Sequence, residues 1–246
     1  MTDRPYELRR VARCGSTNSE LLAEKRLTRP VLLLADEQTA GRGRRGRRWH
    51  SAPGAGLTFS LAVALRRPLR ELAALPLVAG VATVRALQKL GVARAALKWP
   101  NDIVVDGAKL GGILVETKSL GGAIKAVIGI GINLHGAAGL RTRLRREVAA
   151  LDEFVTVPEN GTIADAIAIS LLELVVAFEA QGLEAARGEW ERLDAHAGRK
   201  LRVRLADGRV VTGIASGLDS DGALRIATRD GMRAVRSGRV ISARTA

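Results

Sequence analysis

The chain has little of the chemistry used in covalent catalysis. Its 246 residues include one cysteine, Cys14, and three histidines. A lone cysteine excludes an intrachain disulfide framework, and such a residue is more often small and buried than reactive. Neither a Ser/His nor a Cys/His arrangement for nucleophilic catalysis stands out. The composition therefore agrees with a reaction that requires no protein nucleophile.

Long apolar runs are also missing, although 47% of the residues are hydrophobic. No uninterrupted stretch approaches the roughly 20 apolar residues that span a bilayer. Residues 1–13 are charged throughout and lack the apolar core of a signal peptide. We therefore expect a soluble, cytoplasmic protein that does not associate with a membrane.

Acidic residues are outnumbered by basic ones. The chain has 25 Asp and Glu against 39 Lys and Arg, which gives a net charge of +14. This balance suits binding to polyanions and raises encounter rates with acidic proteins. The basic residues are nevertheless scattered rather than gathered on one helix, so the charge alone is weak support for nucleic-acid binding. A nucleic-acid-binding module stays as an alternative.

Residues 41–49, GRGRRGRRW, contain five arginines, three glycines and Trp49 but no carboxylate. Charge repulsion and the entropy that glycine loses on ordering disfavour such a segment by itself. It matches the pattern G-x-G-x-x-G, but residues 49–54 cannot continue a helix and no acidic residue lies between Gln38 and Arg70. A dinucleotide-binding turn is therefore rejected, as is a P-loop, which ends in Gly-Lys-Ser/Thr. We expect a cationic loop with glycine hinges that closes over a bound anion.

The hydrophobic periodicity predicts a mixture of helices and strands. A capping box at residues 17–20 begins a helix over 18–27, and a second helix starts near Pro76 and ends before Gly91. The pair Asp106-Gly107 indicates a hairpin turn. The expected strands cover 31–35, 57–65, 95–99, 103–105, 110–116 and 124–134, and two further helices cover 162–180 and 183–196. Because helices and strands do not alternate regularly, we predict an α+β fold, with a mixed or antiparallel sheet and flanking helices.

The pattern changes after Gly198. Short apolar segments are separated there by Asp-Gly pairs at 207–208, 221–222 and 230–231. Such spacing is typical of a small β-barrel. We therefore predict two domains, residues 1–198 and residues 199–246.

Several polar groups stand at the ends of apolar segments. Residues 16–18, Ser-Thr-Asn, stand at the start of a helix. Their side chains and the first N–H groups of the helix can bind a polar head group, or the side chains simply cap the helix. Gln38 lies between a strand and the cationic loop. Asn101 and Asp102 offer the oxygen ligands that Mg²⁺ prefers, with a plain polar turn as the alternative. Lys109 stands beside two glycines, where a lysine can bind a carboxylate or a phosphate.

These segments, in this order, resemble the biotin protein ligase family, whose members attach biotin to a lysine of carboxyl carrier proteins. The resemblance covers nearly the whole chain, including the C-terminal small barrel. The motifs that carry it are Ser-Thr-Asn at 16–18, Gly-Arg-Gly-Arg-x-Gly-Arg-x-Trp at 41–49, Lys-Trp-Pro-Asn-Asp at 98–102, Lys-Leu-Gly-Gly-Ile-Leu-Val-Glu at 109–116 and Gly-Ile-Gly-Ile-Asn at 129–133. The resemblance implies a class II synthetase-like catalytic domain followed by an SH3-like β-barrel.

The resemblance also implies roles for individual residues. Lys109 and Arg44 would be catalytic, because they would stabilise charge that develops during adenylation and acyl transfer. The residues implied to bind biotin are Ser16, Thr17, Asn18, Gln38, Arg42, Gly43, Arg44 and Lys109. Those implied to bind ATP or the adenylate are Arg45, Trp49, Asn101, Gly112 and Asn133. Asn101 and Asp102 would bind Mg²⁺.

The implied activity uses ATP, Mg²⁺ and biotin to form biotinyl-5′-AMP. The biotin then passes to a lysine of the biotin carboxyl carrier protein of acetyl-CoA carboxylase. Many relatives also carry an N-terminal DNA-binding domain, but about 15 residues precede Ser16, so we expect no DNA binding. A homodimer is left open. The alternative enzyme is a lipoate or octanoate ligase or transferase. The arginine-glycine segment with Trp49 argues against it, because that segment resembles the signature of the biotin-type enzymes.

Overall fold

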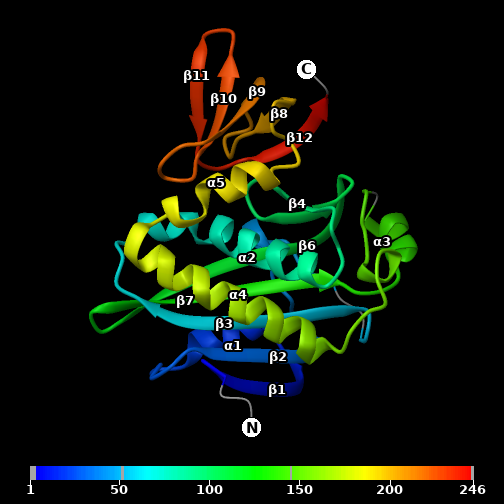
Figure 1. Cartoon of the computed structure of the whole chain (residues 1–246), viewed down its shortest axis with the longest axis vertical. Helices are drawn as coiled ribbons and strands as arrows, with labels where there is room; N and C mark the ends of the chain where they lie inside the picture. Colours follow the sequence, from blue (N-terminus) through cyan, green and yellow to red (C-terminus); the bar gives the residue numbers. More distant parts are fainter. Residues whose placement is uncertain (1–3, 51–52, 145, 245–246) are drawn as a thin grey trace.

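A seven-stranded sheet forms the centre of the molecule (Figure 1). The computed structural model describes residues 4–50, 53–144 and 146–244. The strands are β1 (Glu7–Cys14), β2 (Val31–Gln38), β3 (Gly56–Leu65), β4 (Ala95–Lys98), β5 (Asp102–Val105), β6 (Ala108–Leu120) and β7 (Ala123–Asn133). They lie in the order β1-β2-β3-β7-β6-β5-β4, and only β1 and β2 pair in parallel. The predicted mixed sheet is confirmed.

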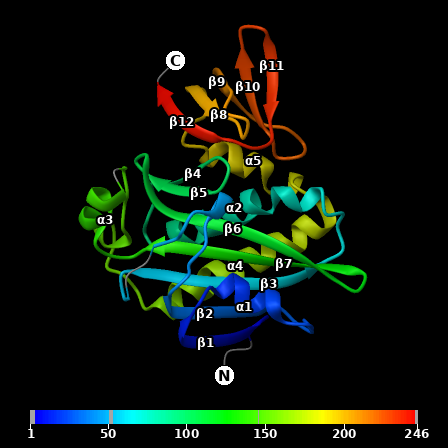
Figure 2. The ribbon, with the colours of Figure 1, turned by 180° about the vertical axis from the view of Figure 1, so that it is seen from behind.

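Helices cover both faces of this sheet. They are α1 (Thr17–Ala23), α2 (Leu75–Lys89), α3 (Ala137–Leu144), α4 (Asn160–Gln181) and α5 (Glu184–Leu193). The long helices α2 and α4 lie on one face, and α1 lies on the other (Figures 1 and 2). In β2, Leu32 and Leu34 join the core beneath the long helices, whereas Val31 and Leu33 pack with Leu21 of α1. Successive side chains of a strand point to opposite faces. Because both faces of β2 are covered, consecutive residues of the strand are apolar.

Most predicted elements are confirmed, and the hairpin turn is one of them. Asp106 and Gly107 have φ angles of 51° and 81° between β5 and β6, as a two-residue hairpin turn of type I′ requires. Strand β1 was not expected, because three arginines interrupt its sequence, ELRRVARC. It is an outer strand that pairs with β2, and charged side chains are common at such edges. Helix α3 was not expected either.

The capping box predicted at residues 17–20 does not form. Ser16 is the N-cap residue of α1 and makes no side-chain cap hydrogen bond. The Thr17 hydroxyl instead contacts Ser60 and Gln38. The helix also ends at Ala23 rather than at residue 27. The polar side chains at its start are therefore used in contacts with the sheet.

Two segments are long and apolar enough by composition to cross a membrane. They are Glu71–Lys89, which is 72% buried in the fold, and Asn160–Gln181, which is 50% buried. They contain α2 and α4, which pack against each other and on the sheet. This packing accounts for their apolar sequences.

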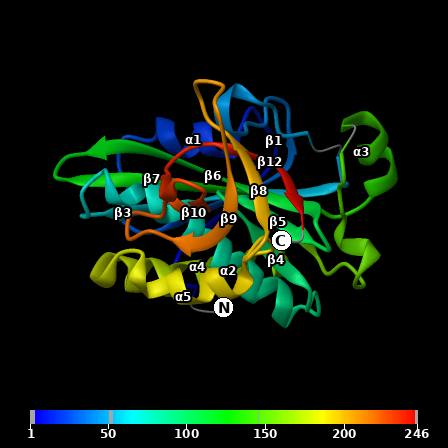
Figure 3. The same ribbon diagram turned by 90° about the horizontal axis from the view of Figure 1, so that it is seen from above.

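The chain then forms a second, smaller antiparallel sheet. Its strands are β8 (Lys200–Arg204), β9 (Val210–Leu218), β10 (Leu224–Thr228), β11 (Gly231–Val235) and β12 (Arg239–Arg244). They lie in the order β11-β10-β9-β8-β12, so β11 and β12 form the edges. A small β unit at this place agrees with the predicted fold class. Figure 1 shows it above the β4 edge of the larger sheet, and Figure 3 looks down on it.

The two sheets share one continuous apolar core, which includes Leu201 and Ile226 of the smaller sheet. Hydrogen bonds also join the smaller sheet to the elements that precede it. The indole Nε1 of Trp99 donates to the carbonyl of Gly222 at 3.2 Å, and the Leu218 N–H donates to Glu191 Oε1 at 2.9 Å. We keep the division between residues 198 and 199 as a proposal, since it falls in the connection from α5 to β8.

Two buried titratable groups lie in that connection. Burial raises the pKa of Asp194 to about 6 and lowers the pKa of His196 to about 4. Between these values the folded protein holds a protonated Asp194 and a neutral His196, whereas the unfolded chain holds both in their charged forms. The Asp194 contribution to stability is lost as the pH rises to about 6, and the His196 contribution is lost as the pH falls to about 4. The two contributions therefore oppose each other.

Replacing Asp194 by Asn should uncover the His196 contribution. Asn retains an oxygen that can accept a hydrogen bond from the backbone N–H of His196, as Asp194 Oδ1 does at 3.0 Å in the native protein. Unlike Asp, it takes up no proton. The free energy of unfolding of Asp194→Asn should therefore fall more steeply than that of the native protein between pH 6.5 and about 4. Urea denaturation across this range measures both slopes. Equal slopes would contradict the assignment.

Candidate functional site

A cavity of about 400 Å³ opens on the face of the larger sheet that carries α1. Its walls come from the start of α1, from residues 42–49, from β5 to β7, and from residues 238–240 at the start of β12. All of the predicted site residues line this cavity except Asn133. Residues far apart in the sequence are therefore brought to one place.

A buried polar cluster closes one end of the cavity. The Thr17 and Ser60 hydroxyls lie 2.6 Å apart, and the Ser60 hydroxyl donates to Asn18 Oδ1 at 2.6 Å. Asn18 Nδ2 donates to Glu116 Oε2 at 2.9 Å, and the Thr17 N–H donates to Gln38 Oε1 at 2.8 Å. Each side chain is held by its neighbours, so the donors and acceptors are already oriented for a polar ligand.

Two members of this cluster, Ser60 and Glu116, were not among the predicted site residues. Ser60 is fully buried in β3, where it and Thr58 are polar residues in an otherwise apolar strand. This interruption is the signal that finds it. Glu116 gives no such signal, because it ends a motif and its partners lie on other elements. Gly129 was also missed, although a Cβ there would overlap the Asn18 side chain.

Lys125 of β7 fixes the other end of α1. Its ammonium is fully buried and donates to the carbonyls of Leu21 at 2.7 Å and Glu24 at 2.6 Å. These carbonyls lie at the C-terminal end of α1, where backbone acceptors lack partners within the helix. The lysine therefore satisfies them and holds the helix on the sheet. Thr17 and Asn18 at the opposite end are positioned as a result.

The arginine-rich segment 41–49 folds as a short hairpin. The Gly43 N–H donates to the Arg47 carbonyl at 2.7 Å, and the Trp49 N–H donates to the Gly41 carbonyl at 2.9 Å. A Cβ at Gly41 would lie 2.7 Å from the Trp49 oxygen, so close approach requires glycine there. The expected cationic loop is thus a hairpin in this structure.

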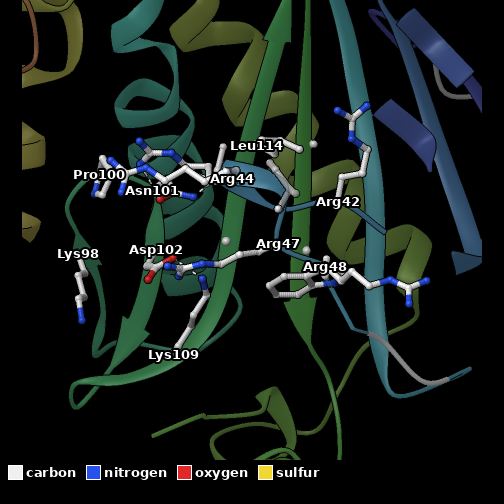
Figure 4. Close-up of a pocket in the computed structure, with 18 of the residues that line it drawn as sticks. Arg42, Arg44, Arg47, Arg48, Lys98, Pro100, Asn101, Asp102, Lys109 and Leu114 are labelled. Carbon is white, nitrogen blue, oxygen red and sulfur yellow. Dashed lines mark hydrogen bonds and ion pairs between the residues drawn. The ribbon is translucent and has the colours of Figure 1, made fainter. Parts of the chain in front are cut away.

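Three arginines of the hairpin reach three different elements. Arg42 pairs with Glu116 at 3.0 Å, Arg44 Nη1 donates to Asn101 Oδ1 at 3.1 Å, and Arg45 Nη2 donates to Ser237 Oγ at 2.9 Å. Burial, followed by repulsion from Arg45, lowers the pKa of Arg44. Its hydrogen-bond partner is a neutral amide rather than a carboxylate. An anion entering the cavity would therefore be strongly attracted to Arg44 (Figure 4).

The Trp49 indole lies against β6 and β7. A Cβ at Gly131 would overlap its indole, and one at Gly112 would lie 3.6 Å from the ring. The Lys109 ammonium is 5.8 Å from the ring centroid, within cation–π range. The indole Nε1 is buried without a hydrogen-bond partner in the part of the chain that the structure describes. The indole therefore sits in the cavity on a floor made of glycines.

Asn101 and Asp102 do not fit a metal site. Asp102 pairs with Lys109, and Asn101 uses its oxygen for Arg44 and its nitrogen for the Ile113 carbonyl at 2.7 Å. Within the described residues no cluster of three or more His, Cys, Asp or Glu side chains is placed to hold a metal ion. Asn101 Oδ1 and Asp102 Oδ1, two of the oxygens expected to bind Mg²⁺, thus already orient two cations. Figure 4 shows Lys109 beside Asp102.

Asn133 lies beneath the cavity rather than in its wall. It is buried, and its Nδ2 donates to the carbonyls of Lys109 at 3.2 Å and Ala149 at 3.0 Å. Its amide group joins the start of β6 to the segment after α3. The predicted contact with adenosine therefore does not follow from this geometry, which gives Asn133 the task of positioning Lys109.

Further cations, which were not among the predicted site residues, surround the cavity. Arg47, Arg48, Arg146 and Arg239 all line it, as does Lys98. Burial lowers the pKa of Lys98. Arg47, Arg48 and Lys98 stand in the motifs quoted from the sequence, where they were given no role. For Arg146 and Arg239 the sequence gives no signal, because arginine is abundant throughout the chain. The site thus gathers more positive charge than the motifs alone predicted.

Comparison with protein families points to the same region. A model described as the biotin/lipoate A/B protein ligase family matches residues 11–133, which is half of the chain. A model of the biotin protein ligase C terminal domain matches residues 196–241. The first match contains the polar cluster, the hairpin and Lys109, and the second contains most of the smaller sheet.

Individual proteins give the same result. The bifunctional ligase/repressor BirA of Escherichia coli is 36% identical over 214 residues; the match covers 87% of this chain and 66% of BirA, so the chain spans about two thirds of that relative. The biotin--[acetyl-CoA-carboxylase] ligase of Paracoccus denitrificans is 33% identical, with coverage of 87% and 91%. The solved biotin protein ligase of Aquifex aeolicus, in complex with biotin and ATP, has a TM-score of 0.81 at 27% identity, with coverage of 98% and 99%.

Replacing Lys125 by Met should loosen α1. The variant keeps an apolar stem but leaves the two helix carbonyls without their charged donor, so the free energy of unfolding should fall by about 2–4 kcal/mol. Lys118 is the matched control, because it lies opposite Lys125 on β6, is exposed, and donates to the Leu22 carbonyl at 3.2 Å. Lys118→Met should cost about 0.5 kcal/mol or less. Equal losses in urea denaturation would show that burial of the ammonium is unimportant.

Proposed function

The chain belongs to the biotin protein ligase family, and on this basis we propose that it activates biotin with ATP and transfers the biotinyl group to a lysine of a carrier protein. One observation carries the proposal. The cavity places a closed polar cluster around Thr17 and Asn18 next to a series of guanidinium and ammonium groups. This order suits a ligand with a polar head group, a carboxylate and a nucleotide phosphate.

In the first step, an oxygen of the biotin carboxylate attacks the α-phosphorus of ATP. The bond from that phosphorus to the β-phosphate oxygen breaks, which gives biotinyl-5′-AMP and pyrophosphate. Negative charge increases on the phosphate oxygens as the reaction proceeds. Arg44, held by Asn101, and Lys109, held by Asp102, supply oriented positive charge to those oxygens.

In the second step, the neutral amine of the carrier lysine attacks the carbonyl carbon of the mixed anhydride. The bond between that carbon and the phosphate oxygen breaks, AMP leaves, and the amine nitrogen loses a proton. The same cations stabilise the developing negative charge. No side chain of the enzyme forms a covalent bond in either step.

The buried polar cluster favours biotin over lipoate or octanoate. The ureido group of biotin has donors and acceptors that match the Ser60, Asn18 and Gln38 side chains. An alkyl chain would leave those groups without partners, and a site built to hydrogen-bond a ligand discriminates strongly against one that lacks the bonding groups. The family model alone does not separate the two chemistries, so this cluster decides between them.

The proposed acceptor is the carrier protein of acetyl-CoA carboxylase, since the relative from Paracoccus denitrificans is named as a ligase for that enzyme. ATP, biotin and such a carrier would meet in the cytoplasm, where we place the reaction. No magnesium ligand is assigned to Asn101 or Asp102, because each is engaged with a cation.

Biotin should support exchange of labelled pyrophosphate into ATP, whereas octanoate and lipoate should not. The first step is reversible, so exchange reports adenylation without any carrier. The enzyme is incubated with ATP, labelled pyrophosphate and each acid in turn, and labelled ATP is counted. Exchange with octanoate or lipoate but not with biotin would overturn the proposal.

Arg44→Ala should lower the adenylation rate by about 10²–10³, the usual loss for one preorganised donor. It should also release biotinyl-5′-AMP faster, because we propose that the hairpin closes over the adenylate and Arg44 joins it to the opposite wall. Filter retention of labelled adenylate measures release. Arg10→Ala is the control, since Arg10 pairs with Asp36 on the sheet edge outside the cavity. Unchanged retention in Arg44→Ala would contradict the closing role.

A further inference from the structure

The smaller sheet carries a large share of the positive charge. Residues 199–246 contain eleven Lys and Arg against four Asp, so about a fifth of the chain holds +7 of the net +14. Such a concentration is not needed for folding, since net charge of one sign repels itself in the compact state. Its arrangement on the sheet shows what it can bind.

Strand pairing collects these cations on one face. Lys200, Arg202 and Arg204 alternate with the buried Leu201 and Val203 along β8, so the three cations share the outward side. In the antiparallel register, Arg239 of β12 lies directly opposite Arg204, and Arg244 lies directly opposite Lys200. We call this surface the basic face; its members are Lys200, Arg202, Arg204, Arg239 and Arg244, all of them exposed.

The basic face has no internal compensation. Within the described residues, none of its five cations forms an ion pair, whereas Arg209 and Arg236 outside it pair with Asp207 and Asp221. Like charges directly opposite each other on neighbouring strands are destabilising. The two opposed pairs, Arg204 with Arg239 and Lys200 with Arg244, are therefore unfavourable in the isolated sheet. An external anionic surface would remove this repulsion.

Exposed apolar side chains identify the class of partner. Val210 lies opposite Arg204 and Ile214 lies opposite Lys200 on β9, and they are 40% and 41% exposed. A surface that mixes cations with large apolar groups suits a protein, whose own surface offers both carboxylates and apolar side chains. The sheet has no aromatic residue on which nucleic-acid bases could stack. The face therefore favours an acidic protein over a nucleic acid.

The basic face is continuous with the cavity. Arg239 belongs to both, and its neighbours Gly238 and Val240 also line the cavity. A protein that presents a lysine to the site would thus meet this face next to the opening. We propose that the basic face docks an acidic surface of the carrier protein that receives biotin. This inference rests on the proposed function of the cavity.

The test is a triple charge reversal, Lys200→Glu, Arg202→Glu and Arg204→Glu, which leaves Arg239 at the cavity unchanged. With the isolated biotin carrier domain of acetyl-CoA carboxylase as substrate, the KM for the carrier should rise at least tenfold. The biotin-dependent pyrophosphate exchange should stay unchanged, and so should transfer of biotin to hydroxylamine, which is too small to need docking. The milder triple replacement by Gln should give an intermediate KM.

A matched control separates docking from general charge attraction. Arg66→Glu, Arg70→Glu and Arg229→Glu change the net charge equally at exposed positions away from the basic face. This control should leave the KM for the carrier within about twofold of the native value, since distant charges are screened at physiological salt. An equal KM rise in both triple variants would overturn the proposal.

Other results also decide between the claims. An unchanged KM in the first triple variant, with exchange intact, would overturn docking but leave the proposed function standing. Absence of biotin-dependent exchange in the native enzyme would overturn the proposed function instead. The native protein could also bind a short DNA duplex. If the first triple variant lost this binding while its KM for the carrier stayed unchanged, the basic face would be assigned to nucleic acid and docking of the carrier would be overturned.

Discussion

The absence of a side chain at two glycines of the central strand β7 is the constraint on which the site depends. A Cβ at Gly129 would overlap Asn18, and one at Gly131 would overlap the indole of Trp49. Helix α1 and the arginine hairpin therefore approach β7 closely only because glycines lie beneath them. The hydrogen bonds of the polar cluster follow from this steric allowance. Strand β7 tolerates these glycines because it lies in the middle of the sheet, paired with β3 on one side and β6 on the other.

Positive charge is the second organising feature, and it is held in place by few carboxylates. Asp102 orients Lys109 and Glu116 orients Arg42, while Arg44 is held by a neutral amide. The cavity is therefore incompletely neutralised, which raises the free energy of the empty site and lowers it again when an anion enters. Pre-oriented cations of this kind need little rearrangement during a reaction. The same imbalance recurs on the smaller sheet.

Local sequence predicted most helices and strands well but not the contacts between them. The turn at Asp106 and Gly107 and the central strands follow from short-range patterns, so they were predicted correctly. The contact of Ser60 with Asn18 depends on the register of β3 with its neighbouring strands. A slip of one residue would turn the Ser60 side chain to the other face of the sheet. The direction of the Asn133 amide depends on carbonyls supplied by other segments. Sequence patterns contain neither kind of information.

The cavity takes its walls from widely separated parts of the chain. Ser16 begins one wall, and Gly238, Arg239 and Val240 form part of another. Because proteins are synthesised from the N-terminus, the polar cluster leaves the ribosome long before β12 does. A nascent chain interrupted before residue 238 lacks that last wall. The complete cavity therefore forms only after nearly the whole chain has been synthesised.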